Sequence, residues 1–230
     1  SPLIDSAVAH VRQHTSLSTL NHCLRSVYWA QILLKRLPPP HEPINVELLA
    51  YACIMHDLGW AITPGLCSAD KRFEVDSANQ AVSFLAKHPA PWDRREREVL
   101  WTAIALHTTP SIGHHHPDQH IRFVQMGIIA DFFGPDMPPP FPPGMITVEE
   151  YQEILTAFPR DGFKNELVGI MCGLCKDKAE TTYDNFVGDF AKMYGLDGKG
   201  SGKEEYAAEW EKHQVAPMLL AGLDSCAQYE

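Results

Sequence analysis

Residues 45–59 read NVELLAYACIMHDLG, and this stretch decides the fold. After Asn45, which suits a helix N-cap, nearly every residue is apolar, so the predicted helix has no polar side to turn toward water. A helix of this kind lies at the centre of a domain. Gly59 is expected to end it. His56 and Asp57 therefore stand at the end of the most hydrophobic helix of the chain.

Helical periodicity dominates the remaining sequence, and no stretch has the pattern of a strand. The prediction is an all-α fold, a helical bundle with a five-helix core at about 18–134. Ser18 or Thr19 is expected to cap the first helix, and prolines at 38–40 and at 89 to end the first and third. Further helices are expected within about 147–230, after a proline-rich loop at 135–143. The expected helices around the central one are 20–37, 76–87, 92–108, 118–133, 148–158, 164–178, 183–194 and 204–214.

The bulk composition predicts one domain, 1–230, because 230 residues can bury one substantial core. The net charge of −10 argues against nucleic acid or an anionic membrane as partner, but not against a small-molecule substrate. No apolar run reaches transmembrane length and the first residues do not resemble a signal peptide. Six cysteines, including the pair Cys172 and Cys175, are interpreted as packing residues, so a cytoplasmic location is expected.

His22 lies inside the first predicted helix. Leu24, Val27 and Tyr28 are interpreted as the buried side of that helix, so the imidazole is expected to point inward or to the edge of the core. A lone inward histidine is more often a hydrogen-bonded core residue than a metal ligand.

Two further groups change that balance. His56 and Asp57 point about 100° apart near a helix end, where both can reach one ion. Asp131 shares a helix face with Ile128, and a buried carboxylate without a cation costs several kcal/mol or stays protonated. His22, His56, Asp57 and Asp131 are therefore the predicted ligands of one metal ion. Two histidines and two aspartates suit zinc, with iron as the alternative, and leave room for an activated water.

The chain resembles the HD superfamily of metal-dependent enzymes and, within it, the cyanamide hydratase family. The resemblance covers about residues 21–190. The segments that carry it are Asn21-His22 with Arg25, IMHDLG (54–59), RFEV (72–75), AIALHT (103–108), IIAD (128–131), FPR (158–160) and KAETTYDNF (178–186). That family is all-helical, binds one zinc and hydrates cyanamide to urea. The resemblance implies a metal-dependent hydratase that adds water to cyanamide or a related small nitrile, giving urea or an amide.

By the same resemblance, the four predicted ligands match the family's metal site, and Glu74 and His107 match the catalytic positions that complete its pocket. Glu74 would carry a proton from water to the nitrile nitrogen, and His107 would orient or protonate the substrate. Without the resemblance, Glu74 is equally well read as an exposed carboxylate in the first turn of a helix.

Two other interpretations stay open. Phosphohydrolases and iron oxygenases of the superfamily hold a second metal with extra histidines, but residues 72–76 contain none, which favours one ion. A non-catalytic binding domain stabilised by a metal is the other option.

The histidines at 114, 115, 116 and 120 are expected in a loop outside the metal site, although one of them lining the pocket mouth stays open. Residues 195–230 either pack on the core or form a homodimer contact.

Overall fold

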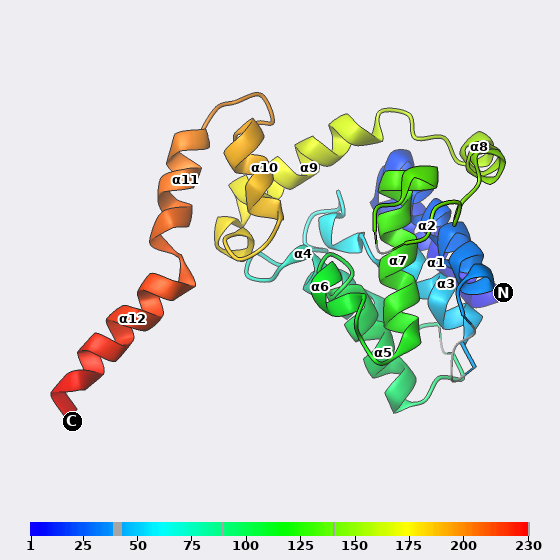
Figure 1. The fold of residues 1–230 in the computed structure, drawn as a ribbon, viewed down its shortest axis with the longest axis horizontal. Helices are drawn as coiled ribbons and strands as arrows, with labels where there is room; N and C mark the ends of the chain where they lie inside the picture. Colours follow the sequence, from blue (N-terminus) through cyan, green and yellow to red (C-terminus); the bar gives the residue numbers. More distant parts are fainter. Residues whose placement is uncertain (39–42, 89, 140, 230) are drawn as a thin grey trace. The chain divides into compact units, whose positions relative to one another are not determined.

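The structure is a computed structural model that describes residues 1–38, 43–88, 90–139 and 141–229. Helices make up all the regular structure of these ranges, and no strand occurs within them, which confirms the all-α prediction (Figure 1). The chain divides into two compact units, Ser1–Phe163 and Lys164–Glu230. A single domain over 1–230 stays a prediction.

The central helix of the first unit is α3 (Val46–Met55), which begins where the Asn45 side chain accepts the N–H of Leu48. Every residue from 48 to 55 is buried, as its composition predicts. The expected end at Gly59 is wrong. His56 is the C-cap, and Asp57, with φ −110° and ψ 13°, leads into a short 3-10 turn, η1 (Leu58–Trp60).

In the described ranges, the first unit also contains six further α-helices, a one-turn helix and the 3-10 helix η2 (Gly134–Asp136). Helix α3 packs against α1, α2, α4, α5 and α7, so that it is enclosed. Among these, α2 also packs along α7, and α4 on α5 (Figure 1). The elements are α1 (Pro2–His14), α2 (Leu17–Arg36), α4 (Phe73–Phe84), α5 (Arg94–Ala105), α6 (Pro110–Gly113), α7 (Gln119–Phe133) and α8 (Val148–Ala157).

Several predicted boundaries are corrected. Helix α2 begins at Leu17 because the Ser16 hydroxyl accepts the Thr19 N–H, so the predicted caps lie inside the helix. Helix α4 begins at Phe73, three residues early, without a side-chain cap. Helices α1 and α6 were not predicted. The predicted stops at Pro39, Pro40 and Pro89 lie outside the described residues.

Gly127 lets α7 approach α2 closely. A Cβ at this position would lie 2.6 Å from Ala30 Cβ and 2.8 Å from Ser26 O. We expect Gly127→Ala to lower the free energy of unfolding by about 1–3 kcal/mol, because the two helices must separate to admit the methyl group. Urea denaturation measures the change. Gly173→Ala, where a Cβ meets nothing within 4 Å, is the control, and equal stabilities of the two variants would contradict the prediction.

Helix α9 (Phe163–Asp177) begins at the last residue of the first unit, and its remainder belongs to the second unit. The second unit also contains η3 (Ala179–Thr182), α10 (Val187–Tyr194), α11 (Lys203–Lys212), α12 (Val215–Cys226) and η4 (Ala227–Tyr229). Cys172 and Cys175 are buried free thiols, and the Cys175 Sγ lies 3.3 Å from Val187 O, as packing cysteines would. Helix α12, which was not predicted, has no buried residue. In the described ranges, no helix has the length and apolar content needed to cross a membrane.

Candidate metal centre

Three side chains converge where α3 ends. His56 and Asp57 close that helix, and His22 projects from the neighbouring α2. The His22 Nε2 lies 3.2 Å from His56 Nε2 and 3.5 Å from Asp57 Oδ2, and the His56 Nε2 lies 3.0 Å from the same oxygen. All three side chains are buried. Within the described part of the chain, this is the one cluster of histidine, cysteine or acidic residues compact enough to hold a metal ion.

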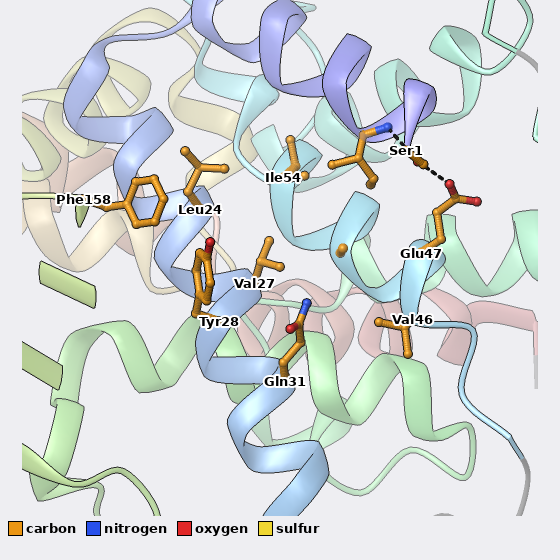
Figure 2. Close-up of a pocket in the computed structure, with 11 residues that line it drawn as sticks. Ser1, Leu24, Val27, Tyr28, Gln31, Val46, Glu47, Ile54 and Phe158 are labelled. Carbon is orange, nitrogen blue, oxygen red and sulfur yellow. Dashed lines mark hydrogen bonds between the residues drawn. The ribbon is translucent and has the colours of Figure 1, made fainter. Parts of the chain in front are cut away.

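His22 lies on the buried face of α2, as expected, but the most buried face is not the one that Leu24, Val27 and Tyr28 form. The most buried face includes His22, Arg25, Ser26 and Trp29, whereas Tyr28 is 44% exposed. Leu24, Val27 and Tyr28 instead line a cavity of about 480 Å³ with residues of α1 and α3, such as Ile54 (Figure 2). At 100° per residue this cavity lies roughly half a turn around α2 from His22, so it is separate from the cluster.

The ring orientations of both histidines follow from their outer nitrogens. The His56 Nδ1 lies 2.8 Å from Cys53 O, and the His22 Nδ1 lies 2.7 Å from Asp131 Oδ2. Because a carbonyl and a carboxylate only accept hydrogen bonds, each Nδ1 carries the hydrogen. In the neutral rings, both Nε2 atoms then present lone pairs to each other and to Asp57.

Asp57 supplies the test of whether a metal fits. Neither of its carboxylate oxygens has a hydrogen-bond partner among the described residues, although the side chain is 1% exposed. A buried carboxylate facing nitrogen lone pairs at 3.0–3.5 Å requires a positive charge between them. Ligands held 2.0–2.1 Å from a tetrahedral zinc lie about 3.3 Å apart, which matches these separations. The three residues therefore fit a divalent cation.

The pKa of Asp57 reflects the same conflict. Burial raises it, but the neighbouring imidazoles, His56 foremost, outweigh burial and lower it below the ordinary value. The carboxylate is thus ionised at neutral pH, which is the state that binds a cation.

Asp131 lies on α7 beyond His22, and its oxygens are not part of the compact group. Its Oδ1 accepts from Arg25 Nε and Trp29 Nε1, both at 2.8 Å. Its Oδ2 accepts from Arg25 Nη2 at 2.8 Å and from the His22 ring. Although burial raises the pKa of Asp131, the hydrogen bonds from Arg25 and His22 lower it further than burial raises it. Ligation by Asp131 stays a prediction.

His107 follows α5 and reaches the cluster from another side. Its Nε2 lies 3.7 Å from Asp57 Oδ1, and its Nδ1 donates to Ile104 O at 2.6 Å. Burial, followed by repulsion from His56, lowers the pKa of His107 to about 4. The ring is therefore neutral at pH 7 and presents the Nε2 lone pair to the site.

Glu74 lies in the first turn of α4 and is buried, unlike an ordinary exposed carboxylate at a helix start. The Arg72 Nη2 donates to Glu74 Oε1 at 2.8 Å, and the Thr108 hydroxyl donates to the same oxygen. Burial raises the pKa of Glu74, but the hydrogen bond and the positive charge of Arg72 lower it below normal. The carboxylate is consequently ionised and acts as an acceptor.

The other histidines have structural contacts. The His120 Nε2 accepts the Asn45 N–H at 2.9 Å, and the His116 Nδ1 accepts the Asp118 N–H. His114 packs edge-on against His115.

Sequence reasoning missed Phe163, which stacks on the His22 ring at 4.7 Å. It included Thr108 only as part of the segment 103–108 that carries the resemblance, without a role, and the structure shows that the Thr108 hydroxyl donates to Glu74.

The sequence model of the HD domain family covers residues 19–148, a span that includes His22, His56, Asp57 and Asp131. No curated protein matches the chain.

Proposed function

The chain belongs to the HD domain family, whose members are generally metal-dependent hydrolases, and from this premise we propose a metal-dependent hydratase. Its substrate would be cyanamide or another small nitrile, and its product urea or an amide. His22, His56 and Asp57 would hold one zinc ion, with iron as the alternative. Such a cation supplies a nucleophilic oxygen from water near neutral pH. The observation that carries the proposal is the buried, ionised Asp57 carboxylate facing the two Nε2 lone pairs.

Hydration of a nitrile requires one proton transfer that Glu74 is suited to perform. A water oxygen bonds to the nitrile carbon, one carbon–nitrogen π bond breaks, and a proton moves from the water to the nitrogen. The isourea formed from cyanamide then tautomerises to urea. Glu74 is ionised, so it can take the proton from the water and return it to nitrogen. The Thr108 hydroxyl and Arg72 hold the carboxylate while it does so.

His107 favours a substrate that carries an N–H group. With its Nδ1 hydrogen directed to Ile104 O and its pKa near 4, it has no proton to give at pH 7. Its Nε2 lone pair accepts a hydrogen bond, either from the amino group of cyanamide or from the water. Of the two roles expected for His107, orientation is therefore the one supported, and protonation is not.

Aromatic rings next to the cluster favour a small substrate. Phe163 stacks on His22, and Phe132 meets the same ring edge-on at 5.4 Å. Phe73 meets the edge of His107 at 5.7 Å and is itself stacked on Trp60. These rings leave the polar groups of the cluster as the main hydrogen-bonding contacts for a ligand there.

The experiment that tests the function combines elemental analysis with urea release. We expect about one zinc or iron per chain and urea formation from cyanamide. Two metal ions per chain with turnover of phosphorylated substrates would support a phosphohydrolase instead, and oxygen consumption with iron would support an oxygenase. A bound metal without turnover of any of these substrates would support a metal-stabilised binding domain.

Glu74→Gln tests the proton transfer. We expect the variant to keep its metal content and to lose about 10²–10⁴-fold in urea release, because an amide cannot accept the proton. Metal content and urea release are measured on the same sample. Glu98→Gln is the control, since Glu98 is an exposed partner of Arg94. A Glu74→Gln enzyme as fast as wild type would remove Glu74 from the mechanism.

A further inference from the structure

We propose that Phe163 is the gate of the candidate metal centre, a side chain that must leave the His22 ring before a cation or a small molecule can reach the cluster. The inference rests on the proposed function in one respect, namely that His22, His56 and Asp57 take a divalent cation. The gate would act on every molecule that enters, whatever reaction follows.

The polar groups of the cluster have almost no contact with solvent. The residues that are at most 1% exposed are His22, His56, Asp57 and Glu74, and His107 is 5% exposed. A cation or a substrate therefore reaches these groups only after a side chain that covers them has moved, as happens at enzyme sites closed by loops or lids.

Phe163 covers one face of the His22 imidazole. The two rings stack, with 4.7 Å between their centroids and 21° between their planes, and Phe163 is 4% exposed. An ion bound to His22 Nε2 lies in the plane of the imidazole, so the stacked ring also flanks the position of the ion. Phe132 is 43% exposed, and its ring centroid lies 6.1 Å from that of Phe163. The ring that covers His22 is therefore one side chain away from solvent.

The two residues before Phe163 have the geometry of a hinge. Asp161 has a φ of 24° and Gly162 a φ of 81°, and both residues are exposed. A positive φ is uncommon for a residue other than glycine, and such a conformation persists only where surrounding contacts enforce it. The stacking of Phe163 on His22 is such a contact. When the rings separate, the backbone of Asp161 can relax, which favours the open position.

The chain before this hinge is fixed. Arg25 Nη1 donates to Phe158 O and Pro159 O, both at 3.0 Å, and Asn21 Nδ2 donates to Pro159 O at 3.0 Å. A movement that began before Arg160 would break these hydrogen bonds. Hinges are usually a few residues that take up the whole change in φ and ψ, and here they are the two after Arg160.

The other aromatic rings near the cluster belong to packed helices. Phe132 lies in α7, which packs along α2. Phe73 lies in the first turn of α4, and a Cβ at Gly59 would lie 1.8 Å from Phe73 O, so the backbone there has no room to shift. These rings are walls of the site, whereas Phe163 follows an exposed turn and can move.

The test compares the rates at which the full-length protein takes up and releases Co²⁺, followed by visible absorption. Uptake is measured by mixing metal-free protein with Co²⁺, and release by mixing the Co²⁺ form with excess EDTA. The closed gate requires a left-handed conformation at residue 162, which an alanine adopts less readily than glycine. We expect Gly162→Ala to raise both rates by the same factor, about 5–30-fold, and to leave the Kd and the spectrum unchanged.

The matched control is Gly144→Ala. Gly144 has a φ of 79°, and at both glycines a Cβ would meet nothing within 4 Å. The control should exchange Co²⁺ at the wild-type rates. Equal rates for the two alanine variants would overturn the inference. Faster release without faster uptake would also overturn it, because that result indicates a weaker metal site and not an opened gate.

A second variant covers the case in which Gly162→Ala does not fold. Phe163→Ala removes the ring itself and should raise the rates of uptake and release together. Wild-type rates for this variant would count against the gate in the same way.

The two proposals fail differently. Wild-type protein that binds Co²⁺ but releases no urea overturns the proposed hydratase and leaves the exchange rates to decide the role of Phe163. Wild-type protein that binds no Co²⁺ overturns both.

Discussion

Asp57→Asn is expected to abolish metal-dependent stabilisation and urea release. The substitution removes the one buried carboxylate of the cluster whose oxygens have no hydrogen-bond partner among the described residues, and leaves the His22 and His56 Nε2 atoms as the remaining pair. We expect the affinity for zinc to fall by more than the roughly 100-fold that marks the upper range for an outer partner. Thermal unfolding with and without zinc measures it, since zinc at 100 times its Kd should stabilise wild type by about 2.7 kcal/mol.

The matched control for this variant is Asp189→Asn. Asp189 is 63% exposed and pairs with Lys192 on α10, in the second unit. It should keep the full zinc-dependent rise in melting temperature. Asp57→Asn protein that shows the same rise would place the cation elsewhere in the chain.

Arg25→Leu is expected to have the largest effect on stability. Arg25 is fully buried, and its removal takes the closest guanidinium from the buried Asp131 carboxylate, which keeps Arg160 at 3.6 Å, and takes the Arg25 donor from Phe158 O. Breaking a buried ion pair in this way costs about 3–5 kcal/mol. That is a large part of the 5–15 kcal/mol typical of a domain. Urea denaturation at pH 7 measures the loss.

The pH dependence of this effect has a definite sign. The folded-state pKa of Asp131 is depressed, so its stabilising contribution is present above the ordinary value of 3.8 and is lost as pH falls below it. Without Arg25 the depression is smaller, and the difference between wild type and Arg25→Leu should shrink in acid. Arg94→Leu, which removes an exposed pair with Glu98, should cost less than 1 kcal/mol at either pH. A stability difference between wild type and Arg25→Leu that is unchanged at low pH would contradict the ion-pair explanation.

The burial of the central helix α3 was predictable from its composition. An almost uninterrupted apolar run can only be buried, and Asn45 marks its start by capping chemistry. The start of α2 was misplaced because Ser18 and Thr19, the expected caps, lie only two and three residues after Ser16, which has the same kind of side chain. Which one accepts an N–H depends on the preceding backbone, and it is Ser16.

The buried face of α2 was misjudged for a different reason. Hydrophobic periodicity assigned Leu24, Val27 and Tyr28 to the core; Leu24 and Val27 do pack against it, partly buried, whereas Tyr28 is exposed, and all three border a cavity. The true inner face contains His22 and Arg25, whose burial depends on Asp131, 109 and 106 residues away. Such a polar interior is stable only as a complete network between helices. The hydrophobic periodicity of one helix therefore does not reveal it.

The meeting of His22, His56 and Asp57 was predictable from the sequence, but their arrangement was not, and ligation by Asp131 stays a prediction. The order of His22, His56-Asp57 and Asp131 indicates a metal site of the HD type. The direction of each imidazole is decided by its outer nitrogen, through Cys53 O for His56 and Asp131 for His22. Glu74 was equally compatible with an exposed position until Thr108 and Arg72 were seen to enclose it.

The close approach of α2 and α7 at Gly127 also bears on the order of folding. His22 and His56 are 34 residues apart in sequence, and His22 meets Asp131 only when these two helices have packed. Contacts between such distant residues close late, because the intervening loops must first lose their entropy. A cation that needs His22 in its fixed orientation then stabilises the finished fold more than the transition state. Bound cation is therefore expected to lower the rate of unfolding and to leave the rate of folding nearly unchanged.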